Sequence, residues 1–128
     1  MFQFPILITV IALTIYQGLS INVSKERDQQ KIKAPATTGN IVFERAYRTH
    51  LNYLENLVIF LPLVWIGNLG FRDNLVYIFA CVTWVIARTI FSYSYIKDLP
   101  LKIKIIPSLL AVLSTLILLV LSLLTAFR

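Results

Sequence analysis

The sequence predicts an all-α integral membrane protein, a bundle of four membrane-spanning helices forming a single domain over residues 1–128. Its composition is 58% hydrophobic and 14% charged, and the mean hydropathy of +0.77 is too high for a soluble domain. Four apolar runs of about 20 residues are each long enough to cross a bilayer. The basic residues gather in short loops beside these runs, which is typical of membrane topology. Despite the net charge of +6, nucleic-acid binding is therefore not expected.

The first two spans are expected over residues 4–21 and 40–67, joined by a polar loop from Ser24 to Gly39. Pro5 suits the first turn of the first helix. The second helix would be ~42 Å long, which exceeds the ~30 Å of a hydrocarbon core. Its polar first half must therefore lie at the membrane interface or be shielded by protein.

The third and fourth spans are expected over residues 75–96 and 101–127, after a turn at residues 67–70 and a second break at residues 97–100. The loops after the first and third spans hold most of the basic side chains: Lys25, Arg27, Lys31, Lys33, Lys97, Lys102 and Lys104. The positive-inside rule then places these loops in the cytoplasm and both termini on the opposite side. A multi-pass protein of the bacterial plasma membrane or of the endoplasmic reticulum fits this pattern.

The second span begins with charged and amide side chains that follow a helical period. Five of them fall within an arc of about 100° on one helix face: Arg45, Arg48, Asn52, Glu55 and Asn56. Charged groups at membrane depth are costly and mark a site that faces a bundle interior or a wet cavity. Arginine binds carboxylates bidentately and a glutamate accepts an ammonium, so this polar stripe suits a small zwitterion. The structural alternative is a network of Arg48–Glu55 and Arg45–Asn52 pairs that only joins helices.

A second polar face is expected on the third helix, where Arg88, Ser92 and Tyr95 lie within about 60° of one another, beside Phe91. Arg88 is expected either to contact a ligand or to act as a counter-ion for Glu55 or Glu44. His50 lies off the stripe and is expected to be a packing residue.

Metal binding is not expected, because a single histidine and a single cysteine cannot form a conventional His/Cys cluster. The cysteine, Cys81, lies inside an apolar run and is expected to be a small packing residue.

The segment Glu44-Arg45-Ala46-Tyr47-Arg48-Thr49-His50-Leu51-Asn52-Tyr53-Leu54-Glu55 resembles the E-R-x-x-R-x-x-x-N-x-x-E motif of the MAPEG family, membrane-associated proteins in eicosanoid and glutathione metabolism. The four spans and the Arg…Tyr pattern of the third helix agree with it over essentially the whole chain. The resemblance implies a homotrimer that binds glutathione as co-substrate between neighbouring subunits near the cytoplasmic leaflet. It implies glutathione contacts at Arg48, Asn52 and Glu55, with Arg45 on the same stripe, and at Arg88 and Tyr95 on the third helix.

The chain departs from the family pattern at two places. Phe91 stands where the family has a histidine or tyrosine, and Lys102 and Lys104 precede Pro107 where well-studied members carry a thiol-activating arginine. A free thiol of pKa about 8.5 is only about 3% ionised at pH 7. Lowering that pKa by ~2 units requires about 2.7 kcal/mol, which one cation in a poorly solvated pocket supplies. Lys102 and Lys104 are the catalytic candidates, with Arg88 as an alternative cation for the thiolate.

Three functions follow from these features. The leading hypothesis is a membrane-bound glutathione transferase or peroxidase whose thiolate attacks a lipophilic electrophile or hydroperoxide arriving from the lipid. The first alternative is a non-catalytic MAPEG-like scaffold or partner-binding protein, motivated by Phe91 and the lysines. The second is a small-solute carrier, which the absence of obvious internal repeats disfavours.

Overall fold

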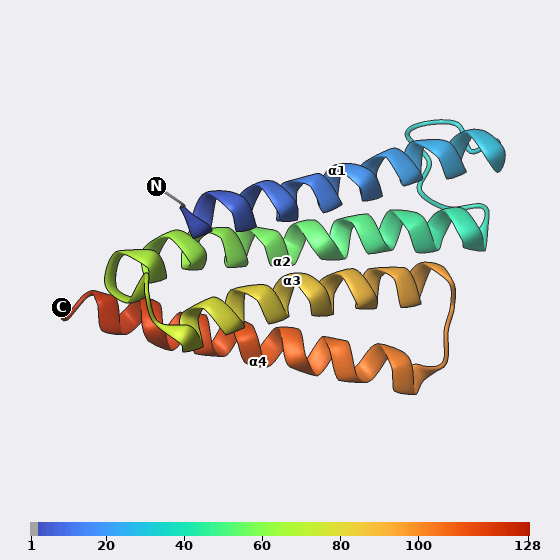
Figure 1. Cartoon of the computed structure of the whole chain (residues 1–128). Helices are drawn as coiled ribbons and strands as arrows, with labels where there is room; N and C mark the ends of the chain where they lie inside the picture. The colour runs from blue at the N-terminus through green and yellow to red at the C-terminus, as the bar shows by residue number, and fades with distance from the viewer. Residues whose placement is uncertain (1–2) are drawn as a thin grey trace.

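The computed structural model describes residues 3–128 and contains four α-helices in this range. They are α1 (Phe4–Gln29), α2 (Ile41–Phe71), α3 (Leu75–Ile96) and α4 (Leu101–Thr125) (Figure 1). Each is long and apolar enough to cross a membrane. The predicted all-α four-helix architecture is therefore confirmed.

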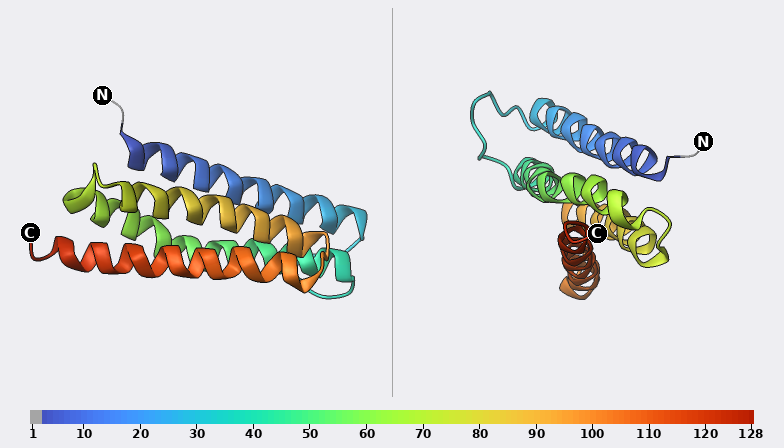
Figure 2. Two further views of the ribbon diagram at one scale, coloured as in Figure 1. Left: turned by 60° about the horizontal axis from the view of Figure 1, so that its bottom comes forward. Right: turned by 90° about the vertical axis from the view of Figure 1, so that its left-hand side faces the viewer.

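The four helices run up and down along a common direction (Figure 1). The α1–α2 and α3–α4 connections lie at one end of the bundle, and the α2–α3 turn lies at the other end with the C-terminus. Helices α2 and α3 each contact all three other helices, whereas α1 and α4 do not contact each other within the described residues (Figure 2). The polar stripe is therefore carried by one of the two inner helices of the bundle.

Asparagine side chains start the two middle helices. Asn40 Oδ1 accepts hydrogen bonds from the backbone N–H groups of Val42 (2.9 Å) and Phe43 (3.3 Å) at the start of α2. Asn74 caps α3 in the same way, at 2.8 and 3.3 Å. These contacts satisfy backbone donors that have no partner inside the helix.

An aromatic core joins α1, α2 and α3. The Trp84 ring of α3 stacks on Phe60 of α2 with 3.8 Å between ring centroids, and it meets Tyr53 edge to face at 5.8 Å. The Tyr53 hydroxyl donates to the carbonyl of Ala12 in α1 at 3.0 Å. This hydrogen bond satisfies a buried hydroxyl and fixes α1 against α2.

The first span ends later than expected. Residues 24–29, assigned to a polar loop, continue α1 to Gln29 because this stretch packs on the start of α2. The Arg27 guanidinium lies 4.6 Å from the Phe43 ring centroid, and its Nη1 donates to the Ala36 carbonyl at 2.7 Å. Arg27 therefore holds the connecting loop in place, in addition to any topological role.

The second span also runs on, since α2 passes through the expected turn at residues 67–70 and ends at Phe71. The glycines there serve helix packing instead: a Cβ at Gly67 would lie 3.0 Å from the Tyr77 ring, and one at Gly70 would lie 2.7 Å from the Thr125 hydroxyl. Helix α3 has the expected bounds, and α4 ends two residues before residue 127.

Candidate functional site

The polar stripe of α2 lies at the end of the bundle that holds the two basic connections. There, a pocket of 230 Å³ is lined by Arg48, Thr49 and Asn52 of α2 and by Phe91 and Tyr95 of α3. Three of the expected ligand residues, Arg48, Asn52 and Tyr95, thus share one pocket. Both walls come from the same chain.

Thr49 was not predicted as part of this pocket. Its hydroxyl donates to the Arg45 carbonyl of its own helix at 2.7 Å. Thr49 lies three residues before Asn52, so both side chains lie on nearly the same helix face. This spacing is the only sign in the sequence that Thr49 belongs to the site.

Arg88 lies behind the pocket and is 6% exposed. Its Nη1 donates to Asn52 Oδ1 at 3.1 Å, and its Nη2 donates to Asn56 Oδ1 at 2.8 Å. The expectation that Arg88 is a counter-ion for Glu55 or Glu44 is therefore wrong, because its partners are amide oxygens. A buried guanidinium needs such acceptors to offset its lost hydration.

The contact with Arg88 also orients Asn52. Because Asn52 Oδ1 accepts from Arg88, the N–H groups of the same amide are the part that Asn52 can offer to a bound molecule. The Asn56 side chain is itself held in place, because its Nδ2 donates to the backbone carbonyl of Asn52 at 2.8 Å. The guanidinium carbon of Arg88 also lies 5.6 Å from the centroid of Phe91, a pocket residue.

Arg48 and Glu55 form an ion pair of 3.3 Å, with side chains that are 53% and 57% exposed. This is one of the two pairs that the structural alternative requires. The other, Arg45–Asn52, is wrong: Arg45 Nη2 instead binds Asp98 Oδ2 at 2.8 Å. Glu55 is thus a surface carboxylate beside Arg48, and Arg45 lies toward the α3–α4 connection.

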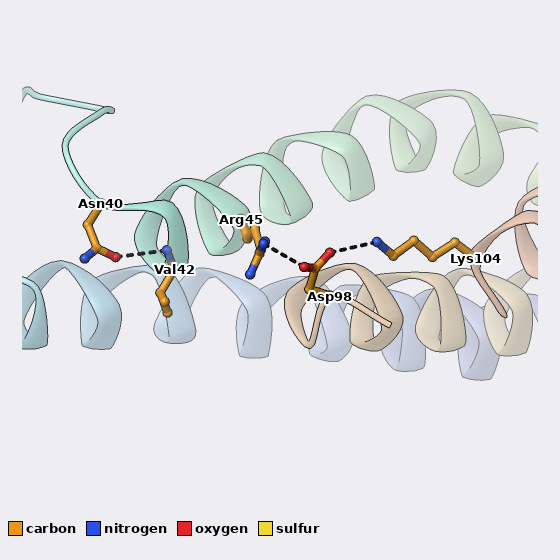
Figure 3. Close-up of polar contacts among 5 residues, drawn as sticks. All are labelled: Asn40, Val42, Arg45, Asp98 and Lys104. Carbon is orange, nitrogen blue, oxygen red and sulfur yellow. Dashed lines mark hydrogen bonds and ion pairs between the residues drawn. The ribbon is translucent and has the colours of Figure 1, made fainter. Parts of the chain in front are cut away.

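Figure 3 shows Asp98 between two cations from different helices. While one carboxylate oxygen binds Arg45 of α2, the other accepts from Lys104 Nζ of α4 at 3.2 Å. The Lys104 ammonium also lies 5.6 Å from the ring centroid of Tyr95, which lines the pocket. The Lys104 side chain is 19% exposed, whereas Lys102 is exposed. Of the two candidate lysines, Lys104 is the one beside the pocket wall.

Sequence reasoning missed Asp98, which it assigned only to a helix break. Asp98 follows α3 with a left-handed backbone (φ 51°), and it lies 53 residues from Arg45. An acidic residue in an otherwise basic connection is the one signal that could have identified it.

The two residues that were expected to serve in packing, His50 and Cys81, lie against other parts of the bundle. His50 stacks on Tyr16 of α1 with 4.9 Å between ring centroids, and its Nε2 lies 3.0 Å from the Tyr16 hydroxyl. Cys81 is buried in the core. Over residues 3–128, no three His, Cys, Asp or Glu side chains gather in a way that would hold a metal ion.

Known proteins are similar to this chain over much of its length. The sequence model described as the MAPEG family matches residues 5–127. An uncharacterized protein of Synechocystis sp. is 37% identical over 91 residues, covering 71% of this chain and 66% of that protein. Leukotriene C4 synthase of Bos taurus is 30% identical over 79 residues, covering 57% of this chain and 53% of the synthase.

The corresponding synthase of Cavia porcellus is 29% identical over 90 residues, covering 64% of this chain and 60% of the synthase. The matches thus cover 53 to 66% of the length of these curated relatives.

Proposed function

The chain belongs to the MAPEG family, and from this premise we propose that it is a membrane-bound glutathione transferase or peroxidase. Family membership and four apolar helices make it a multi-pass integral membrane protein. The similarity to leukotriene C4 synthases supports a glutathione-related activity. The observation that carries the proposal is the pocket of Arg48, Asn52 and Tyr95 with the Lys104 ammonium beside its Tyr95 wall.

The pocket chemistry fits glutathione, which carries two carboxylates, an ammonium and a thiol. Arg48 supplies a guanidinium for one carboxylate, and Asn52 supplies amide N–H donors. Glu55, adjacent to Arg48 on the outer side, supplies a carboxylate for the ammonium. Arg45 and Arg88 complete the basic surroundings, with Arg88 acting through Asn52.

The size of the pocket supports a homotrimer. At 230 Å³ it is smaller than the roughly 300–1,000 Å³ of typical small-molecule sites. A neighbouring subunit would enlarge and close the site on its outer side, where the exposed side chains of Arg48 and Glu55 leave room for it. We therefore propose that glutathione lies between subunits near the cytoplasmic leaflet, in contact with lipid on its outer side.

Lys104 is proposed to stabilise the thiolate. The thiol proton leaves to solvent, and the sulfur then attacks an electrophilic carbon of a lipophilic substrate, forming a C–S bond as the leaving group departs with its electron pair. With a hydroperoxide, the sulfur attacks the distal oxygen and the alcohol departs. A second glutathione then displaces the hydroxyl from sulfur as water, giving the disulfide.

A lysine comparison tests the proposal. Lys104→Ala should lower kcat/KM for conjugation about 25-fold, because the ionised thiol fraction falls from about three-quarters to about 3% at pH 7. Lys97→Ala is the matched control, since Lys97 is an exposed lysine at the end of α3. A large loss in Lys102→Ala instead would assign the role to that lysine.

Purified protein that binds glutathione, yet neither conjugates an electrophile nor reduces a hydroperoxide, would contradict an enzymatic function. That result would favour the scaffold alternative, for which Phe91 in the pocket wall is the structural argument.

A further inference from the structure

Asp98 links the Lys104 ammonium of α4 to Arg45 of α2. Its Oδ2 accepts from Arg45 at 2.8 Å and its Oδ1 accepts from Lys104 at 3.2 Å (Figure 3). One carboxylate therefore bridges α2 and α4 at the end of the bundle where the pocket lies. Charge-assisted contacts of this kind restrict both partners more strongly than neutral hydrogen bonds.

The connection between α3 and α4 is built to present this carboxylate. Asp98 has a left-handed backbone, which aspartate and asparagine adopt more readily than most residues. Its backbone N–H donates to the Tyr95 carbonyl at 3.2 Å, and the backbone N–H of the next residue, Leu99, donates to the Ser94 carbonyl at 2.9 Å. The backbone is thus tied to the end of α3, one turn from the pocket residue Tyr95.

Lys104 depends on such an anchor. A lysine in the first turn of a membrane helix extends its ammonium toward water or lipid headgroups, because the ammonium is strongly hydrated. Here the side chain is only 19% exposed, and its ammonium lies between the Asp98 carboxylate and the Tyr95 ring. Without Asp98, the ring alone would have to offset the lost hydration.

We propose that Asp98 is a positioning residue that holds the Lys104 ammonium beside Tyr95, where it stabilises the thiolate of bound glutathione. This inference rests on the proposed function. Asp98 also carries a negative charge that opposes a thiolate, but its side chain is 55% exposed. Water therefore screens the charge of Asp98 more strongly than that of Lys104, whose side chain is only 19% exposed.

The test is a pH titration of thiolate absorbance with saturating glutathione, comparing the wild-type protein with Asp98→Asn. Asparagine keeps the size and the left-handed backbone of Asp98 but lacks its charge. We expect the pKa of the bound thiol to rise by about one unit, which reduces the ionised fraction at neutral pH about threefold. Asp73→Asn is the matched control, because Asp73 is an exposed acid at the opposite end of the bundle.

A double variant separates positioning from a structural role. In a Lys104→Ala background, Asp98→Asn should leave the remaining thiolate fraction unchanged, because its effect passes through Lys104. An Asp98→Asn protein with a lower melting temperature but an unchanged thiol pKa would overturn the proposal, as would a lowered thiol pKa, which would make Asp98 an opposing charge. Asp98→Ser provides the same comparison if Asp98→Asn is not recovered folded.

The wild-type titration separates the role of Asp98 from the proposed glutathione-dependent function. A wild-type protein that ionises glutathione while Asp98→Asn matches it contradicts only the role of Asp98. A wild-type protein that does not ionise glutathione contradicts the proposed function and, with it, this inference.

Discussion

At the scale of single residues, the exposure of Arg48 and Glu55 indicates that their ion pair adds little to folding stability. Their ion pair is more than half exposed on both sides, and pairs of this kind contribute only about 0–1 kcal/mol to folding. The pair therefore contributes little to helix packing. Both side chains are consequently available to a ligand at the pocket edge.

Arg48→Ala and Glu55→Ala should each weaken glutathione binding by about 1.5–3 kcal/mol, the range for a lost charge-assisted contact. Their melting temperatures should stay near the wild-type value. His50→Ala is the contrasting variant: losing the stack on Tyr16 should lower the melting temperature and leave affinity nearly unchanged. Isothermal titration and thermal unfolding in detergent measure the two quantities. A larger affinity loss in His50→Ala would show that the wrong helix face was assigned.

The residue scale also shows how far the sequence determines a site. The helical period of α2 was enough to predict that Arg48 and Asn52 share a helix face. The polar face predicted on α3 includes Tyr95, which lines the same pocket. The predicted partners of Arg45 and Arg88 were wrong, because the real partners lie on other helices or loops, 53 residues from Arg45 and 36 and 32 residues from Arg88. Periodicity specifies a face of one helix, whereas a partner depends on how two helices are aligned along each other.

At the scale of elements, close packing explains why α2 continues through its glycines. Gly67 lies against Tyr77, a fully buried residue whose hydroxyl donates to the Val64 carbonyl at 2.7 Å. The Tyr77 ring is therefore held in place and cannot easily move aside. This position requires the small volume of glycine.

Gly67→Ala should lower the free energy of unfolding by about 1–3 kcal/mol, the usual cost of overpacking. Gly18→Ala in α1 is the matched control, because a Cβ there would meet no atom within 4 Å. That variant should be stabilised by up to about 1 kcal/mol through helix propensity. Thermal unfolding of both proteins checks the pair, and a neutral Gly67→Ala would mean that α2 and α3 pack less closely than described.

The apolar runs were enough to predict where α2 and α3 begin, and α3 has its expected bounds. The structure adds the physical reason for these starts, because Asn40 and Asn74 cap the two helices. The ends of α1 and α2 were placed too early because polar residues and glycines were interpreted as loop and turn. Both stretches are helical because they pack on a neighbouring helix, which local composition does not reveal.

At the scale of the whole molecule, the separation of α1 from α4 leaves much apolar surface uncovered within the described chain. Lipid and neighbouring subunits are the surroundings that suit such a surface. The two basic connections lie at the same end as the pocket. The positive-inside rule therefore predicts that the pocket opens toward the cytoplasmic leaflet.

Cysteine labelling with a membrane-impermeant reagent tests this orientation. In intact bacterial cells, Thr37→Cys in the α1–α2 connection should be protected and Asp73→Cys in the α2–α3 turn should be labelled. In sealed microsomes, whose outer surface is the cytoplasmic face, Thr37→Cys should be labelled and Asp73→Cys should be protected. The native Cys81 is buried and should give no background. Labelling of Thr37→Cys in intact bacterial cells, or its protection in sealed microsomes, would show the opposite topology.

The most direct test of the central claim is stopped-flow ultraviolet absorbance as purified wild-type protein meets glutathione at neutral pH. We predict a saturable thiolate signal that is lost in Lys104→Ala, because in the proposed function the pocket binds the tripeptide and the Lys104 ammonium ionises its thiol. The absence of a thiolate signal in the wild-type protein at saturating glutathione would contradict the proposal that this protein activates glutathione.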